Sequence, residues 1–266
     1  MEYETLRVEI RDGVAFATID HPPINLLDAV LIRDLDQLNT DLRADPGIRV
    51  LVFESANPEF FLAHGDLRLI VDPEALGRFF AGPGMTLAQR YRELPQITIG
   101  KITGRARGGG HEFLLHLDMR FAAAGRAWFG QPETSLGIFP GGGGTQYLPR
   151  LSGRARALEA ILGADLFDTE TAERYGWINR ALPADELDAY VDRLATRIAS
   201  FPPDAIAAAR RAVDAAEPPI EDGLKVEGAL LQPLFTAPAA VQRATAALTA
   251  GAQTREGELD LEGILG

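Results

Sequence analysis

The sequence predicts an α/β protein with a layered core of strands and helices, residues 1–200, followed by a helical C-terminal region, residues 201–266. Up to about Gly142, short apolar strand patterns alternate with helical patterns, whereas the later patterns are almost all helical. A chain of 266 residues can form one large domain, or a core with a small appendage. Hydrophobic residues make up 46% of the chain and charged residues 24%, a balance that indicates a globular protein rather than a disordered one.

The first elements are predicted to be a β-hairpin and an amphipathic helix. Residues 6–19 alternate in polarity around Asp12 and Gly13, a pair that favours a tight hairpin turn. In residues 29–42, apolar side chains recur at helical spacing, and Asp28 stands in the position of an N-cap.

The rest of the core continues this alternation, and the later elements follow from their helical spacing. We expect strands at 49–54, 96–102, 119–124 and 127–129, and helices within 66–93 and from about 108. We expect later helices at 155–162, 185–200, 204–215, 221–234 and 239–250, with a short strand at 177–179 between them. The acidic, glycine-containing end, 254–266, is typical of a mobile terminus.

Charge and composition exclude several classes of protein. A net charge of −12 argues against broad binding of nucleic acid or of an anionic membrane. No apolar run approaches the roughly 20 residues that a membrane span needs, and the acidic first residues lack the features of a signal peptide. The absence of cysteine excludes disulfides, thiolate metal sites and cysteine nucleophiles. We therefore expect a cytoplasmic protein with no nucleic-acid and no membrane partner.

Two glutamates, each beside glycine-rich sequence, are the main candidates for chemistry. Glu112 ends the run 108–112, in which three glycines open an apolar helix, and Glu133 lies shortly before the glycine run 141–144. Glycines at a helix start leave backbone N–H groups free to stabilise a developing negative charge. A carboxylate one turn further on can move protons beside that charge. The pair therefore favours chemistry next to a carbonyl group.

Each glutamate alone also has a structural explanation. An acid in the first turn of a helix is stabilised by the helix dipole whether or not it has a function. The apolar residues 113–117 after Glu112 indicate a buried helix, which is an unusual place for a charge. Taken together with both glycine-rich turns, the two glutamates favour a functional site over two helix-start acids.

A third candidate is the turn formed by Ala63, His64, Gly65, Asp66 and Leu67. Its small residues could supply a second backbone donor, although an ordinary loop with Asp66 as a helix cap fits the same letters. None of the four histidines has the spacing of metal ligands, so we expect no metal.

As a set, these motifs resemble the crotonase superfamily, the enoyl-CoA hydratase/isomerase family. The resemblance covers residues 5–250. It is carried by Phe61, Ala63, Asp66, Leu67, Gly104, Gly108, Gly109, Gly110, Glu112, Asp118, the run 129–133, Gly137 and the run 140–146.

The resemblance implies a fold and roles for individual residues. The fold would be a crotonase-like spiral of ββα units followed by the helical C-terminal region. The N–H groups of Gly65 and Gly109 would form an oxyanion hole for an acyl-CoA thioester, and Glu112 and Glu133 would be the acid and base. The residues implied to contact the substrate are Ala63, His64, Asp66, Leu67, Gly108 and Gly141.

The reaction that this resemblance implies is hydration of a 2-enoyl-CoA, a lyase reaction. It needs no cofactor beyond the coenzyme A that is part of the substrate. Another crotonase reaction, such as enoyl-CoA isomerisation, is an alternative. A non-catalytic member that binds acyl-CoA or a protein partner is a second alternative, because His64 stands where the family usually has glycine.

The resemblance also implies a homotrimer or a dimer of trimers. Apolar residues of the last helices, among them Leu230, Leu231 and Phe235, are candidates for subunit contacts. Because coenzyme A carries phosphates and the chain is acidic, we expect a local basic patch near the cleft. Candidates for this patch are Arg33, Arg68 and Lys101.

Overall fold

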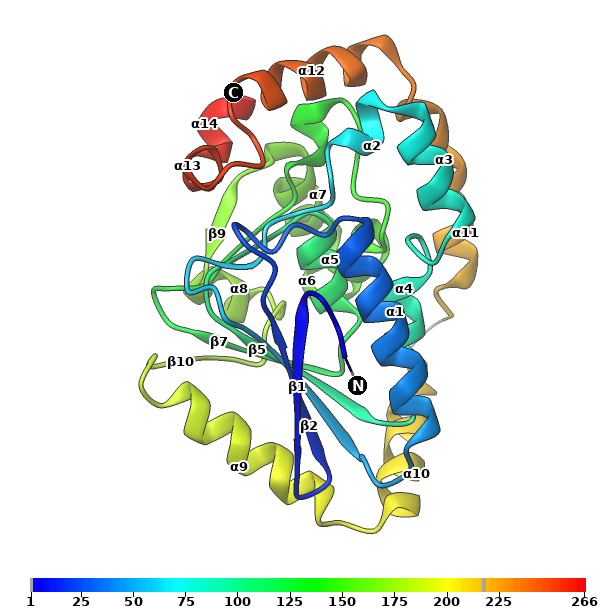
Figure 1. The fold of residues 1–266 in the computed structure, drawn as a ribbon, viewed down its shortest axis with the longest axis vertical. Helices are drawn as coiled ribbons and strands as arrows, with labels where there is room; N and C mark the ends of the chain where they lie inside the picture. The colour runs from blue at the N-terminus through cyan, green and yellow to red at the C-terminus, as the bar shows by residue number, and fades with distance from the viewer. Residues whose placement is uncertain (1, 217–218) are drawn as a thin grey trace.

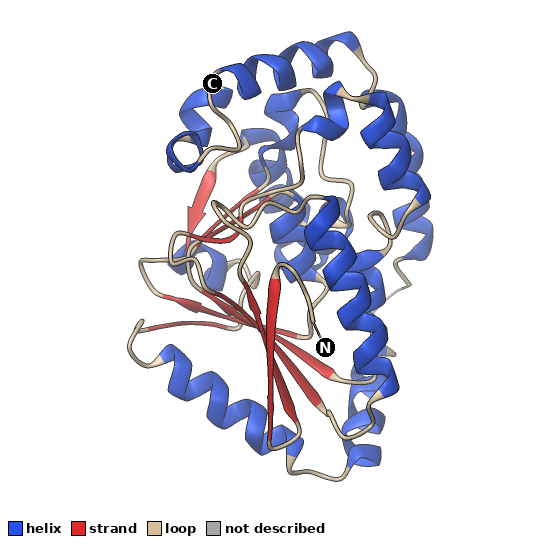
Figure 2. Ribbon diagram, in the orientation of Figure 1, coloured by secondary structure: helices blue, strands red, loops and turns tan. Residues whose placement is uncertain are grey.

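The computed structural model, described for residues 2–216 and 219–266, contains two β-sheets surrounded by helices (Figures 1 and 2). The larger sheet has the strand order β1-β2-β3-β5-β7-β10, and the smaller has the order β4-β6-β8-β9. The strands are β1 (Leu6–Arg11), β2 (Val14–Ile19), β3 (Val50–Ser55), β4 (Phe60–Leu62), β5 (Ile97–Ile102), β6 (Arg105–Arg107), β7 (Met119–Ala123), β8 (Trp128–Gly130), β9 (Leu166–Asp168) and β10 (Arg180–Leu182).

Helices cover the larger sheet and extend beyond it at the C-terminal end of the chain (Figure 1). The helices up to residue 163 are α1 (Ala29–Ala44), α2 (Arg68–Val71), α3 (Pro73–Ala81), α4 (Leu87–Arg92), α5 (Gly109–Leu115), η1 (Pro132–Leu136), α6 (Gly144–Ser152) and α7 (Arg154–Gly163). The later helices are α8 (Thr169–Arg174), α9 (Leu187–Ala199), α10 (Pro203–Asp214), α11 (Glu221–Leu231), η2 (Gln232–Leu234), α12 (Pro238–Thr249), α13 (Arg255–Leu259) and α14 (Leu261–Leu265).

The predicted hairpin and first helix are confirmed. Strands β1 and β2 pair antiparallel, and Asp12 and Gly13 between them have φ angles of 52° and 74°. Positive φ at both central residues is the requirement of the hairpin turn that matches strand twist. The Asp28 carboxylate accepts the N–H groups of Val30 and Leu31 at 3.0 Å and so caps α1.

The core is a spiral in which each turn gives one strand to each sheet. Strand β3 is followed by β4, β5 by β6 and β7 by β8, and within each sheet these successive strands pair in parallel. Alternate side chains of the larger sheet pack on α1 on one face and on α9 on the other. This is the α/β fold of ββα units that the sequence predicted.

The short strand expected at 177–179 is wrong by a few residues. The strand that pairs with β7 is β10 (Arg180–Leu182), and Trp177 lies just before it in a turn. Trp177 is wholly buried among the rings of His111, Phe167 and Tyr175. Its apolar character therefore indicates burial and not strand geometry.

The expectation of a mobile end at 254–266 is also corrected. This segment forms α13 and α14, and the Thr254 hydroxyl accepts the N–H of Gly257 at 3.1 Å as a cap. Glu258 and Leu261 are buried, because they pack against the core rather than face solvent. In Figure 1 these helices lie beside α12 at the end of the molecule opposite α9.

Candidate active site

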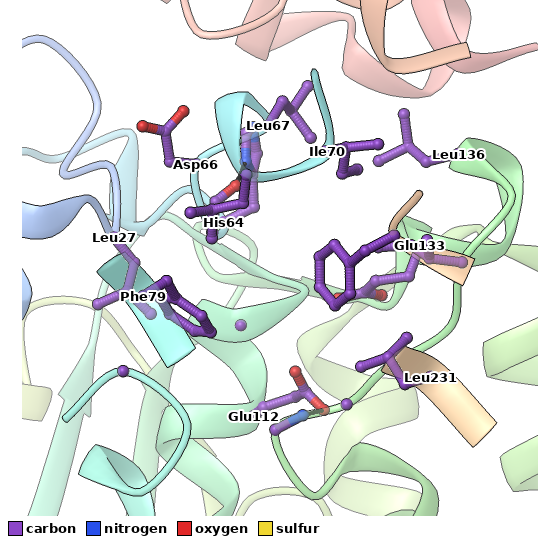
Figure 3. A pocket seen from close by; sticks show the side chains of 18 of the residues that line it. Leu27, His64, Asp66, Leu67, Ile70, Phe79, Glu112, Glu133, Leu136 and Leu231 are labelled. Atoms are coloured by element: carbon purple, nitrogen blue, oxygen red, sulfur yellow. Dashed lines mark hydrogen bonds between the residues drawn. The ribbon is translucent and has the colours of Figure 1, made fainter. Parts of the chain in front are cut away.

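The two glutamate motifs meet at one cavity, to which chain segments far apart in sequence contribute (Figure 3). The polar part of the cavity is lined by residues 64–66, Gly109, Glu112, Glu133 and the pair 141–142. The rest is apolar and is lined by, among others, Leu27, Ile70, Phe79, Leu136, Leu231, Phe235, Leu261 and Leu265. The arrangement suits a ligand with a polar reacting group and an apolar tail.

Glu112 is held by the backbone of the glycine-rich run. It lies in the first turn of α5, and its Oε1 accepts the N–H of Gly142 at 2.7 Å and of Gly144 at 2.8 Å. A Cβ on Gly142 would come within 2.8 Å of the Glu112 Oε2, and one on Gly144 within 2.9 Å of Oε1. The run therefore needs glycine so that its backbone can approach the carboxylate.

Glu133 is held differently. It lies in η1, and its Oε2 is buried without a hydrogen-bond partner among the described residues. A Cβ on Gly108 would lie 2.5 Å from the Glu133 Oε1, so glycine is required there too. A buried carboxyl oxygen without a partner, in the wall of a cavity, is available to a water molecule or a substrate.

Burial raises the pKa values of both glutamates. The pKa of Glu133 rises to about 7, and that of Glu112 rises well above its ordinary value through burial and through the charges of Glu133 and Glu227. The two carboxyls also interact, since the charge of Glu133 contributes to the rise at Glu112. The N–H groups of Gly142 and Gly144 oppose the rise at Glu112 only in part, so both carboxyls lie where burial favours the protonated form.

Two backbone N–H groups, those of Gly65 and Gly109, lie close together in the lining of the same cavity. Gly109 is the first residue of α5, so its N–H has no acceptor within the helix. A Cβ on Gly109 would be 3.5 Å from the Gly65 nitrogen, which donates no hydrogen bond within the described part of the chain. Both N–H groups are therefore free to bind a negatively charged oxygen.

The Gly65 loop is fixed by a short bridge to Leu27. The Leu27 N–H donates to the His64 carbonyl at 3.0 Å, and the Asp66 N–H donates to the Leu27 carbonyl at 3.3 Å. Neither His64 nor Gly65 has a positive φ, so histidine at this position causes no backbone strain. The His64 ring is bound to Glu258 of α13 at 2.8 Å, although the residue also borders the cavity.

Except for Ala63, the other residues singled out from the sequence lie at or behind the cavity. Leu67 and Gly141 line it, as does Asp66, whose carboxylate binds Arg68. Gly108 lies behind the wall, next to Glu133. Ala63 is buried in a small apolar cluster with Ile24, Leu26 and Phe60, away from the cavity.

Sequence reasoning missed two buried acids near the site. Glu227 of α11 accepts hydrogen bonds from the Gly143 N–H, at 2.9 Å, and from the Thr145 hydroxyl. It therefore helps to hold the glycine run in position. Glu258 binds His64 and Arg107. For Glu227 the only local signal was an acid within a largely apolar helical pattern, and Glu258 stands among other acids, so neither residue was marked by its neighbours.

A groove with mixed charge adjoins the cavity and shares Leu27, Asp66 and Phe79 with it. Three arginines line the groove together with four aspartates: Arg33, Arg68, Arg78, Asp28, Asp36, Asp66 and Asp72. Two of the three predicted basic residues, Arg33 and Arg68, line the groove, but its aspartates outnumber its arginines, so the groove is not the basic patch that was expected. Lys101 instead binds Glu54 and Asp188 and lines neither the cavity nor the groove.

Two further features are absent from the described ranges. Residues 2–216 and 219–266 contain no group of three or more acidic or histidine side chains arranged to hold a metal ion. No helix in the same ranges is both long enough and apolar enough to cross a membrane.

Comparison with known proteins places these features in a family. Residues 9–251 match the family model described as enoyl-CoA hydratase/isomerase. A probable enoyl-CoA hydratase of Mycobacterium bovis is 34% identical over 88% of this chain and 91% of its own length. A crotonyl-CoA hydratase of Syntrophomonas wolfei is 32% identical over 75% of this chain and 77% of its own length.

A solved structure agrees with the same grouping. A Streptomyces avermitilis protein, named only provisionally as an enoyl-CoA hydratase, superposes with a TM-score of 0.94 and is 49% identical. The match covers 99% of this chain and 98% of the other. The similarity therefore extends to the C-terminal helices.

Proposed function

This chain belongs to the enoyl-CoA hydratase/isomerase family, and we propose that it adds water across the double bond of a 2-enoyl-CoA thioester. Relatives named as hydratases support such a lyase activity. The observation that carries the proposal is the pair of buried carboxyls, one bound by two amides and one with a free oxygen, beside two unpaired backbone N–H groups.

In the proposed reaction, the thioester oxygen binds the N–H groups of Gly65 and Gly109. The Glu112 carboxylate takes a proton from water as the water oxygen bonds to the β-carbon, and the electrons of the double bond move to the thioester oxygen. Glu133 then gives its proton to the α-carbon, and the enolate returns to a thioester. Glu112 ends protonated and Glu133 charged, so proton exchange between them and solvent restores the enzyme.

General principles indicate how much each part contributes. A general acid or base accelerates a reaction by about 10²–10⁴. Loss of one oxyanion donor costs about 10²–10³ in rate. These donors act on the enolate, which carries the charge, more than on the bound thioester, and so they raise kcat rather than affinity.

The orientation of His64 favours an active enzyme over a non-catalytic member. The ring is bound to Glu258 and the Gly65 carbonyl, so it leaves the Gly65 N–H free. Isomerisation of an enoyl-CoA would use the same oxyanion hole but needs only one group to move the proton. Two carboxyls in different hydrogen-bonding states suit the addition of water better.

We also propose how the substrate and subunits are arranged. The acyl tail would lie among the apolar residues of the cavity, and the coenzyme A phosphates near the arginines of the adjoining groove, with no other cofactor. Residues 201–266 would contribute to a homotrimer or a dimer of trimers in the cytoplasm. Exposed apolar side chains support this: Phe201, Val213, Val226 and Leu230 are 44–68% exposed.

Leu231 and Phe235 were expected at subunit contacts. Both are instead buried within the single chain, where they line the cavity. Light scattering at micromolar concentration should give the mass of three or six chains. A monomer would contradict the proposed assembly but leave the chemistry untouched.

The function is tested by mixing purified protein with trans-2-butenoyl-CoA. The conjugated absorbance should fall, and mass spectrometry should find a product that has gained one water. Glu133→Gln should slow this loss by about 10² or more. A product of unchanged mass from a 3-enoyl-CoA, with no hydration of the 2-enoyl-CoA, would instead indicate an isomerase.

A further inference from the structure

Glu258, near the end of the chain, links the two segments that carry the oxyanion donors. Its Oε1 lies 2.8 Å from the His64 Nε2, and its Oε2 accepts a hydrogen bond from Arg107 at 2.7 Å. His64 directly precedes Gly65, and Arg107 stands two residues before Gly109. One carboxylate therefore connects both halves of the donor pair.

This link is entirely buried. The side chains of Glu258 and Arg107 have no exposed surface, and that of His64 is 5% exposed. Arg107 also donates to the Glu258 carbonyl at 2.9 Å and to Glu262 at 2.9 Å. Removing charges from water is costly, so buried charged groups of this kind depend strongly on the partners that they have.

The hydrogen bonds define the state of the His64 ring. Its Nδ1 lies 2.7 Å from the Gly65 carbonyl, which can only accept. Its Nε2 faces Glu258, whose Oε1 already accepts the Gln253 N–H at 2.7 Å, so this carboxylate also acts as an acceptor. With an acceptor beside each ring nitrogen, this geometry suits a ring that donates from both.

The Nδ1 bond ties this charge to the Gly65 peptide. A donor on the Gly65 carbonyl fixes the orientation of the loop whose N–H is a predicted oxyanion donor. The ionisable groups around the ring are Glu258 of α13 and Glu133 of η1, with Arg107 of β6 behind Glu258. Burial raises the pKa of Glu258, but His64 and Arg107 beside it lower it more, so the net shift is downward, and His64 also opposes the rise at Glu133.

We propose that Glu258 is a positioning residue for the reaction, which holds His64 doubly protonated and so fixes the distance between the Gly65 and Gly109 donors. The proposal rests on the proposed hydration. It also assigns a role to α13. Glu258 of this helix, 194 residues along the chain from His64, holds the loop that supplies one of the oxyanion donors. This accounts for histidine at position 64 as the partner of a buried acid.

The first experiment uses Glu258→Gln, which keeps the shape of the side chain and removes its charge. We expect kcat for 2-enoyl-CoA hydration to fall roughly tenfold to hundredfold, as for a small displacement of a reacting geometry. KM should change by less than about threefold, because the donors act mainly on the transition state. Glu258→Asp, which restores the charge, should recover part of kcat.

The control is Glu59→Gln. Glu59 forms a bidentate ion pair, at 2.6 and 2.7 Å, with Arg255, which belongs to α13 as Glu258 does. This ion pair lies on the surface and away from the donors. This variant loses a contact that holds α13 but keeps the buried link, so kcat should stay within about twofold. Equal losses of kcat in the two variants would mean that α13 only supports the fold, and would overturn the proposal.

The second experiment does not depend on activity. In wild-type protein at pH 7, ¹⁵N NMR of the His64 ring should show both nitrogens protonated, and in Glu258→Gln a neutral ring protonated at Nδ1. A neutral ring in the wild type would overturn the proposal. If the wild type hydrates no 2-enoyl-CoA but has the doubly protonated ring, the proposed function fails while the link itself is supported.

Discussion

The two sides of the cavity are held by different kinds of contact. On the Glu112 side, the carboxylate is bound by backbone N–H groups of a nearby glycine run, 30 and 32 residues along the chain. On the His64 side, the Gly65 loop is bound by buried charged side chains, one of them 194 residues away. Figure 3 shows the two sides on opposite walls of the same cavity.

This difference predicts how each side can fail. Backbone amides cannot be removed by a side-chain substitution, so the Glu112 side is sensitive mainly to an added Cβ that displaces the carboxylate. The His64 side depends on several charges at once, and loss of one leaves the others buried without a partner. Activity should therefore be sensitive to added side-chain bulk on the Glu112 side, which backbone amides hold, and to loss of a charge on the His64 side, which charged side chains hold.

The largest effect is expected on the amide-held side, from Glu112→Gln. The amide cannot accept a proton from water, so kcat should fall by about 10² or more while the fold is retained. The measurement is steady-state hydration together with circular dichroism. Activity within threefold of the wild type would remove Glu112 from the mechanism.

A steric test of the same side is Gly142→Ala. The new Cβ would come within 2.8 Å of the Glu112 Oε2, so the carboxylate must move, and kcat should fall at least about tenfold. The matched control is Gly163→Ala, because a Cβ there meets nothing within 4 Å. If the two variants have the same kcat, the glycine run does not set the position of Glu112.

Glu133, whose Oε2 has no hydrogen-bond partner among the described residues, should make the stability of the protein depend on pH. The pKa of Glu133 is raised to about 7 in the folded chain, above its unfolded value, because burial disfavours its charge. Between about pH 4.5 and 7, Glu133 ionises readily in the unfolded chain but stays protonated in the folded one. The free energy of unfolding therefore falls as the pH rises through this range.

Glu133→Gln removes this penalty, so its gain in unfolding free energy over the wild type should be up to about 3 kcal/mol larger at pH 8 than at pH 4.5. Urea unfolding at the two pH values, at one protein concentration, measures it. Glu170→Gln is the control, since that side chain is 86% exposed. A gain that is equal at both pH values would contradict the buried, uncharged state of Glu133.

The smallest effect is expected at the edge of the side-chain-held region. Gln253 donates from its side chain to Asp66 at 2.9 Å, next to Gly65. Gln253→Ala keeps the backbone N–H that binds Glu258, so it should lower the unfolding free energy by about 1 kcal/mol and change kcat less than threefold. A tenfold loss of kcat would show that Asp66, and not only Glu258, orients the loop.

Local features of this molecule could be predicted from sequence because local physics decides them. The turn at Asp12 and Gly13 requires positive φ, and the cap at Asp28 binds N–H groups two and three residues ahead. The glycine-rich setting of Glu112 and Glu133 likewise marks places where backbone approaches a carboxylate closely. The turn and the cap lie within a few residues of the signals that predict them, whereas the glycines that approach Glu112 lie 30 and 32 residues along the chain.

The sequence by itself thus determined the alternation of strands and helices, the candidate acids and their glycines, since propensity, capping and steric needs act over short stretches of chain. Only the tertiary structure decided that 254–266 packs as helices, that Trp177 is core, and that Glu258 and Arg107 meet His64. An acidic segment is typical of a solvated tail until partners 151 and 194 residues away neutralise its charge. Burial of a charge depends on those distant partners, and no local pattern encodes them.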